Sequence, residues 1–139
     1  MMARRYPATL AIAALAAAAA THAQTAPGGS AAWPGISRTA LQRHDLSLAG
    51  REMIQVRVDF EPGAAAPAHR HPGEEIVNML GGSLEYRIEG RPAVTLTAGD
   101  VLFIPSGAVH AVRNVGRGKA SELATYLVAK DEPLITLEP

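Results

Sequence analysis

Residues 63–82 read GAAAPAHRHPGEEIVNMLGG. Side chains two positions apart in a strand face the same side, so His69 and His71 can direct both imidazoles at one point. The Pro-Gly pair that follows is expected to interrupt the strand, because proline lacks a backbone N–H and glycine admits positive φ. We therefore expect Glu75 to approach the same point from beyond a bend.

A second stretch, residues 99–114, reads GDVLFIPSGAVHAVRN and supplies a fourth donor. We predict one metal site whose ligands are His69, His71, Glu75 and His110. Imidazoles and one carboxylate suit a divalent Fe, Mn, Ni, Cu, Co or Zn ion, and four protein donors leave open positions on a metal that prefers five or six ligands.

A lone His-x-His is more simply interpreted as two solvated histidines. The distribution of the five histidines favours a site instead. His22 lies in a predicted leader, and three of the other four belong to this set. His44 is left over and is interpreted as a surface residue or a satisfied polar residue.

The glycines and prolines around these donors have a spacing that resembles the two cupin motifs. The first motif is matched by Gly63, His69, His71, Glu75 and Gly82, and the second by Gly99, Pro105, Gly107, His110 and Asn114. The spacer between the motifs resembles that of microbial single-domain cupins. The resemblance covers residues 63–114 directly and extends to about residues 36–137.

The resemblance implies an all-β fold, the cupin-type double-stranded β-helix (jelly-roll) barrel. It also implies that the four donors are the metal ligands, that the motif glycines and Pro105 form turns, and that Asn114 is a polar residue just past the last ligand. Cupins often form homodimers, so a homodimer is expected. A barrel that keeps the motifs and works without metal is the alternative.

Short alternating segments independently predict an all-β chain. Met53–Phe60 alternates between apolar and polar side chains. Further strands are expected at Glu75–Leu80, Ser83–Glu89, Ala93–Thr97, Val101–Ile104, His110–Asn114 and Glu122–Ala129. A β-sandwich is the structural alternative, and the metal constellation favours a barrel with the site inside.

Strand parity predicts which side chains surround the metal. Val77 and Met79 share the side of Glu75, and Val112 shares that of His110, so the cavity should be mainly apolar and suit a small ligand. Four further residues could contact that ligand, although core packing or exposure is the simpler interpretation of each: Tyr86, Arg87, Phe103 and Tyr126.

The first 35 residues are distinct from the barrel. A short basic start, the apolar run Ala8–Ala20 and small residues before position 24 predict a signal peptide over residues 1–23, too short for a convincing membrane span. Residues 24–35 are rich in Pro, Gly and small residues and predict a flexible arm, with Trp33 docking it. Residues 36–139 are the predicted domain, exported to the periplasm or secreted.

Charge and cysteine content exclude several classes of partner and chemistry. Cleavage would remove Arg4 and Arg5 from the 13 Lys and Arg and leave 13 Asp and Glu, so the mature chain is slightly acidic. Such a chain has no electrostatic attraction for nucleic acid or for an anionic membrane. With no cysteine it has neither a disulfide nor a thiol nucleophile.

Three functions remain open at this point. The first is a metal-dependent enzyme acting on a small organic molecule, with oxygenase or oxidase chemistry favoured over isomerase or decarboxylase chemistry. The second is a non-catalytic periplasmic module that binds or senses a small ligand or a metal. The third, a purely structural dimerising barrel, is disfavoured by the complete donor set.

Overall fold

The computed structural model describes residues 33–139; the predicted signal peptide and residues 24–32 of the predicted arm lie outside this range. The described chain forms strands and no helix, so none of its segments is a helix that could cross a membrane. The strands are β1 (Ile36–Asp45), β2 (Arg51–Phe60), β3 (Ala65–Arg70), β4 (Gly73–Gly81), β5 (Ser83–Ile88), β6 (Val94–Thr97), β7 (Val101–Ile104), β8 (His110–Asn114), β9 (Ala120–Ala129) and β10 (Thr136–Leu137).

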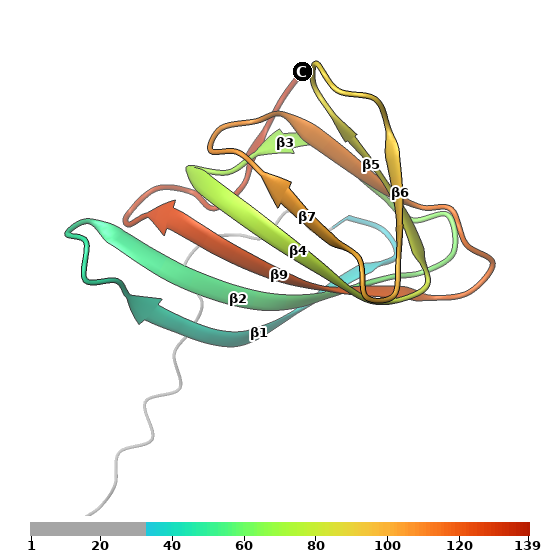
Figure 1. Ribbon diagram of the computed structural model, residues 1–139, viewed down its shortest axis with the longest axis horizontal. Helices are drawn as coiled ribbons and strands as arrows, with labels where there is room; N and C mark the ends of the chain where they lie inside the picture. Colours follow the sequence, from blue (N-terminus) through green and yellow to red (C-terminus); the bar gives the residue numbers. More distant parts are fainter. Residues whose placement is uncertain (1–32) are drawn as a thin grey trace, which may run out of the picture.

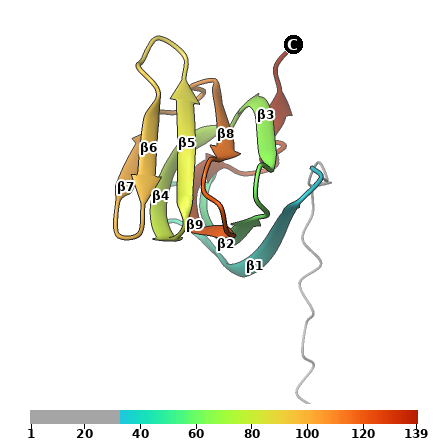
Figure 2. The same cartoon turned by 90° about the vertical axis from the view of Figure 1, so that its right-hand side faces the viewer.

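The strands form two five-stranded antiparallel sheets that face each other. One sheet has the order β1-β2-β9-β4-β7, which can be followed across Figure 1, and the other has the order β10-β3-β8-β5-β6, most of which is seen in Figure 2. From β2 to β5, and again from β6 to β10, the chain changes sheet at every connection. This topology is the predicted jelly-roll barrel, and the all-β prediction is confirmed.

The core lies between the two sheets and follows the alternation of the sequence. In β9 every second residue is buried, and in β2 the predicted inward side chains Val56, Val58 and Phe60 are 6%, 1% and 2% exposed. Burying one such side chain stabilises the fold by about 1.5–3 kcal/mol. Most side chains in the interior are therefore apolar, and only a few polar side chains are buried among them.

The predicted interruption after His71 is confirmed. Strand β3 ends at Arg70, Pro72 is a bend, and β4 begins at Gly73 in the other sheet, so Glu75 does approach from beyond a bend. One strand was given no bounds in advance: residues 36–45, which lack an apolar alternation, form β1 by pairing with β2 at the sheet edge.

The turn before β8 contains Gly107, whose backbone conformation favours glycine. Gly107 has a φ of 71°, and its amide donates a hydrogen bond to the carbonyl of His71, at 3.2 Å. An added Cβ would meet nothing within 4 Å, so a substitution is opposed only by backbone strain. The turn therefore supports the chain at a predicted ligand.

We expect Gly107→Val to lower the free energy of unfolding by about 1–2 kcal/mol, because a β-branched residue strongly disfavours positive φ. Gly107→Asn should be milder, since asparagine tolerates this conformation. Thermal unfolding of both variants checks the prediction. Equal stability of the valine variant and the wild type would contradict it.

Candidate metal centre

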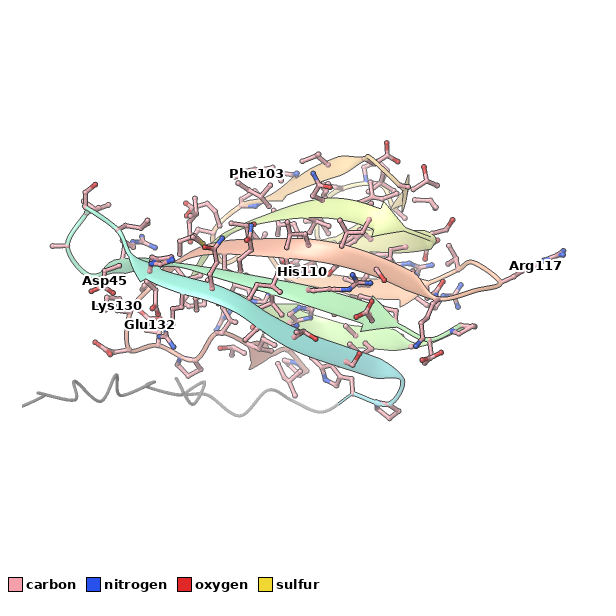
Figure 3. The ribbon with its side chains drawn as sticks, turned by 90° about the horizontal axis from the view of Figure 1, so that it is seen from below. Asp45, Phe103, His110, Arg117, Lys130 and Glu132 are labelled. Atoms are coloured by element: carbon pink, nitrogen blue, oxygen red, sulfur yellow. The ribbon has the colours of Figure 1, made fainter. Side chains whose placement is uncertain are left out.

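Three histidines and one glutamate from both sheets meet inside the barrel. His69 is in β3, His71 follows that strand, Glu75 is in β4 and His110 begins β8. Their exposed fractions are 4%, 3%, 3% and 2% respectively. One ring nitrogen from each histidine lies within 4.8 Å of those of the other two. Figure 3 shows His110 in the middle of the barrel, whereas Phe103 lies at its periphery.

Backbone carbonyls fix the orientation of each imidazole. The Nδ1 atoms of His69, His71 and His110 lie 2.7, 2.6 and 3.0 Å from the carbonyl oxygens of Pro67, Leu134 and Ala108. A carbonyl only accepts, so each Nδ1 carries the proton and donates it. In the neutral ring this leaves the lone pair on Nε2, which is the state that a metal ligand needs.

Glu75 completes the cluster from β4. Its Oε2 lies 3.1 Å from Nε2 of His71 and 3.3 Å from Nε2 of His110. The Oε2 atom and Nε2 of His71 are buried, and neither has a hydrogen-bond partner of acceptable geometry. Buried polar atoms are rarely left unsatisfied, and a cation between these donors would satisfy both. The residues present therefore fit a divalent transition metal.

The protonation states also suit metal binding. Burial, reinforced by the nearby His110, lowers the pKa of His69 to about 4, so this ring is neutral at neutral pH. Burial acts to raise the pKa of Glu75, but the contacts with His110 and His71 outweigh it and hold the pKa below its usual value. Glu75 is thus an ionised carboxylate. No proton must be removed from either residue at neutral pH before a metal binds.

The predicted surroundings of the site are confirmed in part. Val77, Met79 and Val112 face the interior, with exposed fractions of 0%, 1% and 5%. Of the four further candidates, Arg87 and Phe103 are exposed on the outer surface. Tyr86 and Tyr126 are buried instead, and the Tyr126 ring lies 4.7 Å from that of His71.

Sequence reasoning missed several interior polar residues. Glu122 is 3% exposed and accepts a hydrogen bond from the hydroxyl of Tyr86. Burial and the charge of Glu75 raise the pKa of Glu122 to about 8. The sequence did contain a signal for its burial, because Glu122 has the same strand parity as Ala124 and Tyr126.

Trp33 was expected to dock the arm, and its ring packs 5.0 Å from that of His69.

The raised pKa of Glu122 predicts a pH-dependent stability. Between about pH 5 and about pH 8 the folded state keeps the proton that the unfolded chain releases, so this group lowers the free energy of unfolding as pH rises. Glu122→Gln does not titrate. Across this range we expect it to gain up to about 4 kcal/mol of stability relative to the wild type, measured by urea unfolding. Parallel curves for the two proteins would contradict the prediction.

An open surface pocket of about 460 Å³ lies outside the barrel, beside the C-terminal residues. Its lining includes Ala111 and Arg87, whose strand parity is opposite to that of the inward residues of β8 and β5. His110 also borders it, but the imidazole of His110 belongs to the buried cluster. The chemistry of the donors, rather than the size of this pocket, locates the candidate site.

A jelly-roll barrel with a buried cluster of three histidines and a carboxylate defines a class of metal-site β-barrels. Residues 56–126, about half of the chain, match the family model described as "Cupin domain". The chain belongs to this family, as the motif spacing indicated.

Known proteins similar to this chain include enzymes and a binding protein. The dimethylsulfoniopropionate lyase DddQ of Ruegeria pomeroyi is 46% identical over 55 residues, which are 40% of this chain and 27% of the lyase. The oxalate-binding protein of Thermotoga maritima is 34% identical over 83 residues, 59% of this chain and 68% of that protein. A structure of oxalate oxidase in complex with glycolate has a TM-score of 0.60 and 29% identity, covering 79% of this chain and 59% of the oxidase.

This chain is short beside several of its relatives. It spans 27% of the lyase and, among the germin-like proteins that it matches, 35% of one from Oryza sativa and 48% of one from Arabidopsis thaliana. The similarity therefore covers only part of each of these relatives. The activities of the complete relatives bear on this chain only as proposals.

Proposed function

We propose that this protein is a metal-dependent cupin enzyme that acts on a small carboxylate, with oxidase or oxygenase chemistry favoured. The observation that carries the proposal is the convergence of three imidazoles, each held by a carbonyl at Nδ1, around one ionised carboxylate. The proposed ligands of one divalent ion are His69, His71, Glu75 and His110. Fe, Mn, Ni, Cu, Co and Zn are all compatible with this donor set.

The electrostatics of the cluster favour an anionic ligand. Three neutral imidazoles and one carboxylate leave a divalent ion with one net positive charge, which attracts a carboxylate oxygen. Val77, Met79 and Val112 exclude water from the interior and so strengthen that attraction. A bound transition metal would supply Lewis acidity and, for Fe, Mn, Ni or Cu, redox chemistry at its open positions.

The named ligands of similar proteins support the substrate class. Dimethylsulfoniopropionate, oxalate and glycolate are all small molecules with a carboxylate group. The oxalate-binding protein, whose similarity covers most of its own length, favours a second candidate function, a periplasmic module that binds or senses a small carboxylate without turnover.

Elemental analysis of protein purified without added metal or chelator is the first test. We expect about one transition metal ion per chain; Fe, Mn, Ni or Cu would then be followed by oxygen-uptake assays with small carboxylic acids. Turnover would support the enzyme, and carboxylate binding without turnover would support the second function. A metal-free protein that binds no carboxylate would contradict both.

Export and dimerisation are further proposals. N-terminal sequencing of protein recovered from the periplasm or the medium should begin at Gln24 if the signal peptide is cleaved after Ala23.

A homodimer is supported by Val101 and Phe103, which are 58% and 53% exposed on the edge strand β7. Light scattering of the mature protein should give twice the monomer mass, and a monomer mass would contradict the dimer.

A further inference from the structure

We infer that Arg38, held by Tyr126, is an anion-binding group beside the metal centre and that the ligand is a short dianion such as a dicarboxylate. One carboxylate of this ligand would lie at the metal and the other at the guanidinium. The inference rests on the proposed function, because it names the class of carboxylate that the same site takes.

Arg38 lies on the edge strand β1, but its side chain is directed into the barrel. It pairs with Val58 across the sheet, and Val58 pairs with Glu122, so Arg38 belongs to an inward-facing row. Its Nη2 donates a hydrogen bond of 2.9 Å to the hydroxyl of Tyr126, which is further along β9 than Glu122. The side chain therefore runs lengthwise along the inner surface of the sheet.

Tyr126 connects this guanidinium to the metal centre. It is the register partner of Glu75 on the neighbouring strand β4, and its ring lies 4.7 Å from that of His71. The Tyr126 side chain thus contacts Arg38 through its hydroxyl and lies beside His71, a proposed metal ligand, through its ring. A molecule at the open positions of the metal would thus have a guanidinium within the same interior.

Arg38 has unused capacity to donate hydrogen bonds. A guanidinium has five N–H donors, and within residues 33–139 the side chain of Arg38 makes one hydrogen bond and no ion pair. Arg43, on the same strand, shows the ordinary arrangement, because two of its nitrogens donate to the carboxylate of Glu52. The geometry of a guanidinium matches a carboxylate, which can accept two parallel hydrogen bonds from it.

The charges around Arg38 leave room for an anion. The acidic groups that act on it are Glu75, whose charge a metal would offset, and Glu122, whose buried carboxyl accepts a hydrogen bond from Tyr86 and whose pKa is raised chiefly by burial. The metal with its ligands and the guanidinium would each have one net positive charge. A dianion balances both, whereas a monocarboxylate balances one.

Calorimetric titration of the Mn-loaded protein with malonate and propionate tests this inference. The two acids have three-carbon chains and differ by one carboxylate. The wild type should bind malonate more tightly. Arg38→Met should lower the malonate affinity about tenfold or more, and Arg38→Lys less, while the propionate affinity and the metal content stay within about threefold of wild type. Arg113→Met, on the exposed face of β8, is the matched control and should change neither affinity.

Each other outcome has a distinct meaning. If both acids bind and Arg38→Met weakens neither, or weakens both equally, Arg38 does not receive a second carboxylate. If Arg38→Met also loses the metal, Arg38 is a structural counter-ion of the interior instead, and the inference is wrong. If the loaded wild type binds neither acid, the proposed function itself fails.

Discussion

Replacing His71 with alanine is expected to lower the affinity for the metal at least about a hundredfold, because loss of an outer contact to a ligand alone costs 10- to 100-fold. The substitution removes one of the converging Nε2 donors and leaves Glu75 without its nearest imidazole, at 3.1 Å. It also leaves the Leu134 carbonyl without a partner, which costs about 1–3 kcal/mol of stability. The barrel should still fold, and elemental analysis after gel filtration gives the metal content.

His44→Ala is the matched control for this experiment. His44 is exposed on β1 and is no part of the buried cluster, so its removal should leave the metal content unchanged. Circular dichroism of both variants shows whether the barrel has folded. A folded His71→Ala protein with full metal occupancy would mean that the metal is bound elsewhere.

Gly73→Ala is expected to have the largest effect on folding, a loss of about 3 kcal/mol or more or failure to fold. An added Cβ at Gly73 would lie 2.1 Å from the carbonyl oxygen of Leu127 and 2.6 Å from the Cα of Val128. These are backbone atoms of β9, so no side-chain rotation can relieve the overlap. The two strands would have to separate where β4 begins, two residues before Glu75.

Gly81→Ala, at the other end of β4, provides the control for that substitution. The added Cβ would meet nothing within 4 Å, and its φ is not positive, so the change should alter the unfolding midpoint little. Urea unfolding and metal content of both variants separate local strain from a general intolerance of alanine in β4. Similar midpoints for the two variants would show that β9 adjusts at no cost.

The sequence was sufficient to predict most of the barrel, because its strands obey simple alternation. Val101–Ile104 and His110–Asn114 were predicted with the bounds that the structure has, and β2, β4, β5, β6 and β9 to within two residues at each end. No bounds were predicted for strand β1, and the reason is physical. An edge strand with one partner and a largely exposed surface needs little apolar periodicity, so its pairing with β2 decides its structure.

The convergence of the four donors was also expected, from strand parity for His69 and His71, from the bend before Glu75, and from the resemblance to the second cupin motif for His110. The backbone carbonyls that orient the histidines were not predicted. The carbonyl of Leu134, for example, lies 63 residues along the chain from His71, so no local pattern reveals that contact. Arg38 was missed because its chemical role depends on which way an edge-strand side chain points. The register of β1 against β2, interrupted by a bulge after Ala40, sets that direction and is not encoded in any short motif.

Strand β9 pairs with β2 along all ten of its residues and with β4 on its other side, although Phe60 and its partner Ala120 are far apart in the chain. At ~5–20 residues per second, a ribosome needs ~3–12 s to make the ~60 residues between them. During that time the β1–β2 hairpin has an open hydrogen-bonding edge that no native strand can cover. A newly made chain is therefore exposed to non-native pairing until its last long strand emerges, and a chaperone that covers β2 should increase its yield.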